Sequence, residues 1–178
     1  MTKQEIQTIS SHGLAGIVFT SKDEIDRLLL EVAKVLELSG LKLAGVLQTS
    51  QPQTRERERS VFLRGLGSDW EMPVLQKRGM HARGCRLDSQ AITDIAGRLL
   101  NDLQEKPDLL IINRFGRAES EGYGLRQVLE QAVGDEIPVL IGVREDYQGP
   151  WEQFHGGLGD ALPPDLHSVL AWCTSKCD

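Results

Sequence analysis

Basic and amide side chains follow two of the most apolar runs of this chain. Asn113, Arg114 and Arg117 come after one such run, and Lys22 comes after another. Guanidinium forks match oxyanions bidentately, and the backbone N–H groups at helix N-termini add further donors. Since ligands of an open parallel sheet bind beyond the carboxyl ends of its strands, we expect these groups to form one anion-binding crevice.

A second basic cluster lies in the glycine-flanked segment GMHARGCRLD. Arg83 and Arg86 flank Cys85, and no acidic residue occurs in this segment before Asp88. The glycines allow the backbone to approach a ligand closely, and neighbouring positive charge can stabilise a cysteine thiolate. Two interpretations stay open: the cluster contributes to the anion site, or it is a solvated loop in which Cys85 is a small, partly buried residue.

Gly116 and Glu119 complete the segment that follows the central apolar run. Glu119 has no evident nucleophile beside it, so the pattern is a weak basis for acid–base catalysis. The cysteine and histidine spacings fit neither CxxC nor HExxH, so we expect no metal site. We therefore predict no catalytic residue and no cofactor. His155, before two glycines, either lines the crevice or is hydrogen-bonded within the fold.

Alternating strands and helices must position these groups. Short apolar, β-branched runs predict strands over residues 14–20, 43–48, 61–63, 74–76, 109–113 and 139–143. Helical periodicity and capping residues predict helices from Ser21 to Leu38, over 90–104, 123–133 and 151–154, and from Asp165 to Cys173. This alternation predicts an α/β fold of three layers with a mostly parallel sheet. We expect one domain over residues 1–178 and leave open an antiparallel ribbon inserted around residues 55–80.

The composition of the chain argues against several classes of function. The chain has 178 residues, 40% of them hydrophobic and 5% aromatic, and a formal net charge of -6. An acidic chain with few aromatic residues argues against general binding of nucleic acid or of anionic membranes. The apolar runs are too short to cross a bilayer, no secretory leader is evident, and the cysteine count is odd, so we expect a cytoplasmic protein.

Four segments together resemble a bacterial domain-of-unknown-function family, DUF2478. They read RGCRLD, NRFGRAESEG, IPVLIGV and LPPDLHSVLAWC in this chain, and RGCRLD, NKFGKxEAEGxG, IPVLxGV and LPPDLxxLxxWC in the family. The resemblance extends from the first predicted strand to the last predicted helix. It implies a cytoplasmic protein whose relatives are often encoded near molybdate-transport genes, and it supplies no demonstrated activity.

The segment NRFGRAE is more distantly similar to the P-loop nucleoside-triphosphatases of thermophiles, in which the central strand ends in D-E-x-G-K-x-E. Gly116, Arg117 and Glu119 match this pattern. Asn113 stands where the magnesium-supporting aspartate belongs, and Arg114 stands where the water-activating glutamate belongs. The resemblance implies a P-loop NTPase-like fold whose catalytic carboxylates are lost.

The phosphate loop is degenerate by the same comparison. A working loop reads GxxxxGK[ST], because its glycine amides cradle the phosphates and its lysine reaches them. This chain reads TSKDEID, which keeps Lys22 but has no glycine between Gly16 and Gly40.

These observations favour a non-hydrolysing module that binds a small anion, either molybdate or a phosphorylated metabolite. One alternative is a divergent nucleoside-triphosphatase or nucleotide-dependent transferase. Another is a non-enzymatic interaction subunit or homo-oligomer that uses Trp151 and Trp172 as contacts. The residues expected to hold the ligand are Lys22, Arg83, Cys85, Arg86, Asn113, Arg114, Gly116, Arg117 and Glu119.

Overall fold

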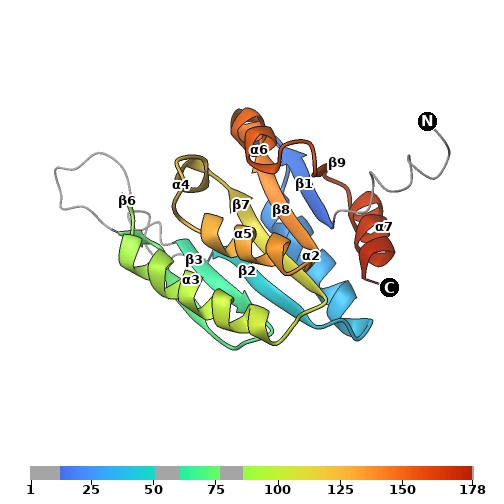
Figure 1. Cartoon of the computed structure of the whole chain (residues 1–178), viewed down its shortest axis with the longest axis horizontal. Helices are drawn as coiled ribbons and strands as arrows, with labels where there is room; N and C mark the ends of the chain where they lie inside the picture. Colours follow the sequence, from blue (N-terminus) through green and yellow to red (C-terminus); the bar gives the residue numbers. More distant parts are fainter. Residues whose placement is uncertain (1–12, 51–60, 77–85, 178) are drawn as a thin grey trace.

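A twisted, mostly parallel sheet organises the chain (Figure 1). The computed structural model describes residues 13–50, 61–76 and 86–177. Its strands are β1 (Leu14–Phe19), β2 (Leu43–Ser50), β3 (Val61–Leu66), β4 (Glu71–Pro73), β5 (Leu75–Gln76), β6 (Arg86–Leu87), β7 (Leu109–Phe115), β8 (Val139–Arg144) and β9 (Asp160–Leu162). In the described part, the main sheet has the order β4-β3-β2-β7-β8-β1-β9. The strands from β2 to β9 in this order pair in parallel, while β3 and β4 pair antiparallel at one side.

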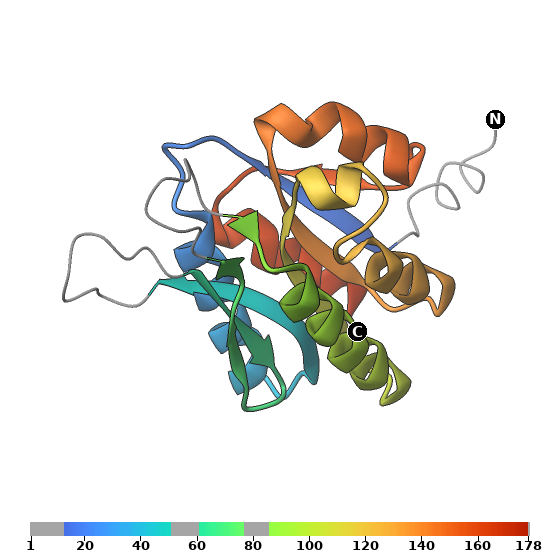
Figure 2. The same ribbon diagram turned by 90° about the vertical axis from the view of Figure 1, so that its left-hand side faces the viewer.

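Helices cover both faces of this sheet, as Figures 1 and 2 show from two sides. They are α2 (Ile25–Leu38), α3 (Ser89–Gln104), α4 (Arg117–Ser120), α5 (Arg126–Gly134), α6 (Gln148–His155) and α7 (Leu166–Lys176), with a 3-10 turn, η1, at Glu145–Tyr147. One core lies under α2 and α7, and the other lies under α3, α5 and α6. The predicted α/β fold of three layers with a mostly parallel sheet is confirmed.

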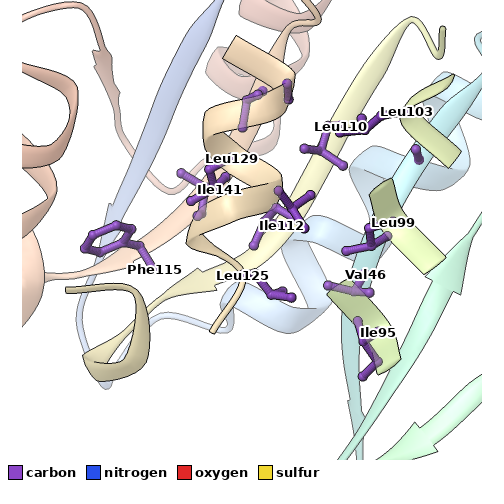
Figure 3. Packing of buried hydrophobic residues seen from close by; sticks show 14 of the residues in the cluster. Val46, Ile95, Leu99, Leu103, Leu110, Ile112, Phe115, Leu125, Leu129 and Ile141 are labelled. Atoms are coloured by element: carbon purple, nitrogen blue, oxygen red, sulfur yellow. The ribbon is translucent and has the colours of Figure 1, made fainter. Parts of the chain in front are cut away.

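The apolar run that opens β7 lies at the centre of both cores. Leu109 and Ile111 pack under α2 and α7, whereas Leu110 and Ile112 pack under α3 and α5. Figure 3 shows Ile112 beside Leu129 of α5 and near Leu99 of α3. Because successive side chains of a strand point to opposite faces, a strand covered on both sides is apolar throughout.

A β-bulge near the end of β7 redirects its polar residues. The register between β7 and β8 shifts between Ile112 and Phe115, although both side chains belong to the core under α3 and α5. Gly142 of β8 lies opposite this irregularity, and a Cβ there would be 2.4 Å from the carbonyl oxygen of Asn113. The bulge therefore requires glycine in β8, and it turns Asn113 and Arg114 toward the α2 face.

The connections at the carboxyl ends of the strands leave the sheet toward both of its faces. The loop after β1 leads into α2 on one face, whereas β7 and β8 lead into α4, α5 and α6 on the other face. Adjacent strands whose connections depart to opposite faces leave a gap between their loops. In the strand order found here, the two adjacent strands whose connections leave toward opposite faces are β1 and β8, and β7 lies on the other side of β8.

The start of the first helix and two short elements differ from the predictions. The first helix begins at Ile25 rather than after a cap at Ser21, and its N-cap residue, Glu24, makes no side-chain cap hydrogen bond. Instead, the carboxylate of Asp23 accepts hydrogen bonds from the backbone N–H and the hydroxyl of Thr20. The short helix α4 and the edge strand β9 were not predicted.

The strand predicted over residues 74–76 is divided between two partners. The N–H of Val74 donates to the carbonyl of Val61, which continues the antiparallel pairing of β3 with β4. Residues 75–76 form β5 and pair with β6 in a separate two-stranded sheet. Within the described ranges, no helix combines the length and the apolar character that crossing a bilayer requires.

Candidate functional site

Asn113 and Arg114 together hold the carboxylate of Asp26. The amide Nδ2 of Asn113 donates to Asp26 Oδ1 at 2.7 Å, and Nη2 of Arg114 donates to Oδ1 and Oδ2 at 3.3 and 3.1 Å. The guanidinium carbon of Arg114 also lies 5.6 Å from the ring centre of Phe19. An amide and a guanidinium converging on one carboxylate is the arrangement of an oxyanion receptor.

The burial of these three groups is unequal. Asn113 is only 4% exposed, whereas the side chains of Arg114 and Asp26 are 38% and 37% exposed. Asp26 lies in the first turn of α2, where the helix dipole favours a negative charge. The site therefore has a buried amide donor and a guanidinium and carboxylate that both reach solvent.

Two buried polar atoms near the ends of neighbouring strands lack partners. Among the described residues, neither Nε of Arg114 nor Oγ1 of Thr49 has a hydrogen-bond partner. Thr49 belongs to the end of β2, which pairs with β7. A buried donor without a partner costs about 1–3 kcal/mol, so these atoms mark positions that a bound polar group would stabilise.

Lys22 lies in the loop between β1 and α2 and is exposed. No carboxylate in the described part of the chain forms an ion pair with it. Asp23 and Glu24 follow it in the loop that corresponds to the degenerate phosphate loop, so this loop carries two carboxylates beside its one ammonium group.

The side chain of Glu119 points into the loop to which the residue belongs. Its carboxylate oxygens accept hydrogen bonds from the N–H groups of Gly116 at 3.1 Å and of Leu125 at 3.3 Å. Burial raises the pKa of Glu119, and hydrogen bonds from backbone N–H groups, its own included, only partly offset this rise. A Cβ on Gly124, whose φ is +66°, would lie 2.8 Å from Oε1 of Glu119, so glycine is needed there as well. Glu119 thus organises the loop after β7.

The remaining basic side chains of this edge are exposed and paired. Arg117 forms an ion pair with Glu121 at 3.0 Å, and Arg144 pairs with Asp146. The predicted Arg83 and Cys85 lie outside the described residues. The predicted Arg86 opens β6, where only its backbone is described.

The two tryptophans and His155 have structural contacts. Trp151 and Trp172 are 2% and 8% exposed, so neither presents a surface to a partner. Nδ1 of His155 accepts hydrogen bonds from Gly157 and Gly159, each at 3.1 Å. These contacts fit the interpretation of His155 as a residue hydrogen-bonded within the fold.

Two cavities lie away from Asp26. One of about 630 Å³ is at the opposite edge of the sheet, where Pro107 and Pro138 precede β7 and β8. A second of about 250 Å³ is bounded by Val18 of β1, by α6 and by β9. The candidate anion site at Asp26, Asn113 and Arg114 therefore coincides with neither cavity.

Asp26 is the member of this cluster that the sequence did not predict. The strand order could have indicated it, because the first turn of a helix that follows β1 lies at the same edge of the sheet as the end of β7, two strands away. Asp26 precedes Arg114 by 88 positions, so no local pattern connects them.

Comparisons with known proteins agree with this fold. The model of a family described as a protein of unknown function, DUF2478, matches residues 14–172. A molybdenum import ATP-binding protein, ModC 2 of Bradyrhizobium diazoefficiens, is 29% identical over 164 residues. That alignment covers 92% of this chain and 18% of the relative, so the chain spans less than a fifth of that protein. No solved structure matches the chain.

Proposed function

This chain belongs to the DUF2478 family, and we propose that it binds a small oxyanion at the carboxyl edge of its sheet without hydrolysing nucleotide. The observation that carries this proposal is the contact of Asn113 and Arg114 with Asp26. The two side chains already bind an oxyanion, in the form of a carboxylate. Lys22 in the adjacent loop adds a positive charge that a ligand larger than a carboxylate could use.

The residue types at this edge disfavour phosphoryl transfer. That reaction depends on positioning the phosphates and on neutralising their charge, with magnesium held by a carboxylate. Here Arg114 and Asn113 end the central strand, and the loop of residues 20–24 has no glycine. An arginine at this position repels a divalent cation and attracts an anion directly. The binding we propose is therefore independent of magnesium.

Two ligand classes fit the proposal: molybdate and a phosphorylated metabolite. Both present tetrahedral oxygens with two negative charges near neutral pH, which suits a guanidinium, an amide and an ammonium group. The ModC-like relative, whose name refers to molybdenum import, supports molybdate as the first ligand to test.

A thermal-shift screen tests the proposal. Molybdate, tungstate, sulfate, phosphate and ATP are each added with and without magnesium. A ligand at a hundred times its dissociation constant stabilises the native state by about 2.7 kcal/mol, a shift that is readily measured. We expect stabilisation by the oxyanions in the presence of a chelator. Stabilisation by ATP and magnesium alone would instead support the nucleoside-triphosphatase alternative.

Arg114→Ala is expected to weaken oxyanion binding by about tenfold or more, since hydrogen bonds to charged groups contribute roughly 1.5–3 kcal/mol. Titration calorimetry with sulfate or molybdate measures the change. Arg27→Ala is the matched control, because Arg27 of α2 is also an arginine in exposed ion pairs, which it forms with Glu24 and Glu31. Equal losses in the two variants would show that net charge, and not the Arg114 site, determines binding.

A further inference from the structure

We propose that Asp26 is an internal competitor that occupies the oxyanion site in the absence of ligand and restricts it to doubly charged oxyanions. This inference rests on the proposed function and adds the ligand class and the residue that sets it. The competing group is part of the chain, so its effective concentration at the site is always high.

Asp26 uses the donors that a ligand would need. Its Oδ1 accepts from both Asn113 and Arg114, and its Oδ2 accepts a second contact from Arg114. Asn113 is buried, so its amide would lack a partner if Asp26 left and nothing replaced it. Without a ligand, the carboxylate of Asp26 therefore accepts the hydrogen bonds of Asn113 and Arg114. A ligand must displace this carboxylate or share the same donors.

The amide of the receptor is better fixed than the carboxylate, because Asn113 is buried whereas Asp26 is not. Asn113 is held in a bulge whose carbonyl lies against Gly142, and the guanidinium of Arg114 lies over the ring of Phe19. Asp26 is more than a third exposed, so its carboxylate can rotate into water without a change in the core. Exchange of one anion for another needs only this local movement.

The charge balance of the exchange selects the ligand. One carboxylate already neutralises the single charge of Arg114, so a monoanion that replaces it makes no additional charge pairing. A dianion has about twice the Coulomb attraction to the same guanidinium at the same distance. For the second charge of the ligand, the proposal assigns the exposed ammonium group of Lys22, in the loop directly before α2.

Asp26→Asn removes the competing charge and keeps the shape of the side chain, including an oxygen that can accept from Arg114. We expect calorimetry to give this variant an affinity for sulfate and molybdate about tenfold higher than that of the unmodified chain, because one repelling charge in contact with the site is gone. We also expect acetate and nitrate to bind the variant at millimolar concentration, and the unmodified chain not to bind them in that range.

Asp146→Asn is the matched control. Asp146 also forms an ion pair with an arginine that follows a parallel strand, Arg144, but it does not contact Arg114. We expect its affinity for sulfate to stay within twofold of the unmodified chain. Melting temperatures of all three proteins without anions verify that each is folded.

Hydrogen exchange of the unmodified chain gives a second test that needs no variant. Sulfate or molybdate should increase amide exchange in the first turn of α2, since the anion releases Asp26 from β7. If Asp26 had only a structural role, binding would leave this exchange unchanged or lower it, and that result would overturn the inference.

The outcomes separate the two proposals. If sulfate and molybdate bind the unmodified chain and bind Asp26→Asn no more tightly, Asp26 is not a competitor, and the proposed function stands. If they bind neither protein in its folded state, the proposed function fails, and the inference fails with it.

Discussion

Gly45→Ala is expected to prevent stable folding, with a loss of more than about 4 kcal/mol in the free energy of unfolding. Gly45 lies in β2 with φ at +130°, a conformation that residues with a Cβ rarely adopt. A Cβ at this position would be 1.8 Å from the carbonyl oxygen of Ile111. Gly45 and Ile111 are partners in the parallel pairing of β2 with β7, so the oxygen cannot move without breaking the centre of the sheet.

Gly97→Ala is the matched control for this prediction. Gly97 lies inside α3, and a Cβ there meets nothing within 4 Å. Alanine is favoured over glycine in a helix interior, so we expect a gain of about 0.5–1 kcal/mol. Urea denaturation followed by circular dichroism measures both variants. A Gly45→Ala protein that unfolds within about 1 kcal/mol of the unmodified chain would contradict the close approach of the two strands.

The close approach at Gly45 also bears on the candidate site. It fixes β2 against the strand that ends in Asn113 and Arg114. Thr49, four positions beyond Gly45, and Arg114, three positions beyond Ile111, carry the buried and unpartnered atoms Oγ1 and Nε. A glycine in the core thus helps to determine where these polar groups lie.

Most of the fold could be predicted because its elements carry strong local patterns. The run Leu109–Ile112 is apolar on both faces, and such a strand belongs in the middle of a covered sheet. The periodicity of α2 and α3 likewise predicts their buried faces. These patterns are repeated along most of the chain, and together they specify an α/β fold with a mostly parallel sheet.

The elements that were missed depend on tertiary contacts. The strand β9 has three residues and exists because it pairs with β1, and Asp160 within it accepts a hydrogen bond from Trp172 at 3.0 Å. The helix α4 is a single turn held by Glu119. Elements this short do not show a hydrophobic periodicity, so they cannot be predicted from their sequences.

The candidate site was predictable in its residue types but not in its pairing. Polar residues after parallel strands must gather at one edge, which places Lys22, Asn113 and Arg114 in the same region. The side to which Asn113 and Arg114 turn depends on the bulge in β7, which no residue pattern indicates. Their partner, Asp26, and the inward orientation of Glu119 follow from packing across the fold.

Glu119→Ala is expected to lower the free energy of unfolding by about 2–4 kcal/mol, because it leaves the N–H groups of Gly116 and Leu125 without acceptors in a buried loop. Glu119→Gln keeps one acceptor oxygen and should lose less. Glu121→Gln is the control, since Glu121 is exposed and pairs with Arg117 and Tyr123. Its effect on urea denaturation should be much smaller than that of either change at Glu119.

The pH dependence of Glu119→Gln distinguishes a buried carboxylate from a merely hydrogen-bonded one. Burial raises the pKa of Glu119 above its ordinary value of 4.5, so the native state binds more protons than the unfolded state between that value and the raised one. As the pH falls through this window, the unmodified chain gains stability and the Gln variant does not. The stability difference between them should therefore widen from pH 7 toward pH 4.5. A difference that narrows would mean that the two backbone donors outweigh burial and lower the pKa.

The same variant separates the two roles proposed for this carboxylate. The nucleoside-triphosphatase alternative requires Glu119 as a general base or magnesium ligand. In that case the glutamine variant would lose magnesium-dependent phosphate release. If Glu119 instead organises the loop after β7, the glutamine variant would be less stable. Its Asn113 and Arg114 would still bind sulfate, with an affinity within about threefold of the unmodified chain. Both of its oxygens accept from backbone N–H groups of that loop, so the structure supports the second outcome.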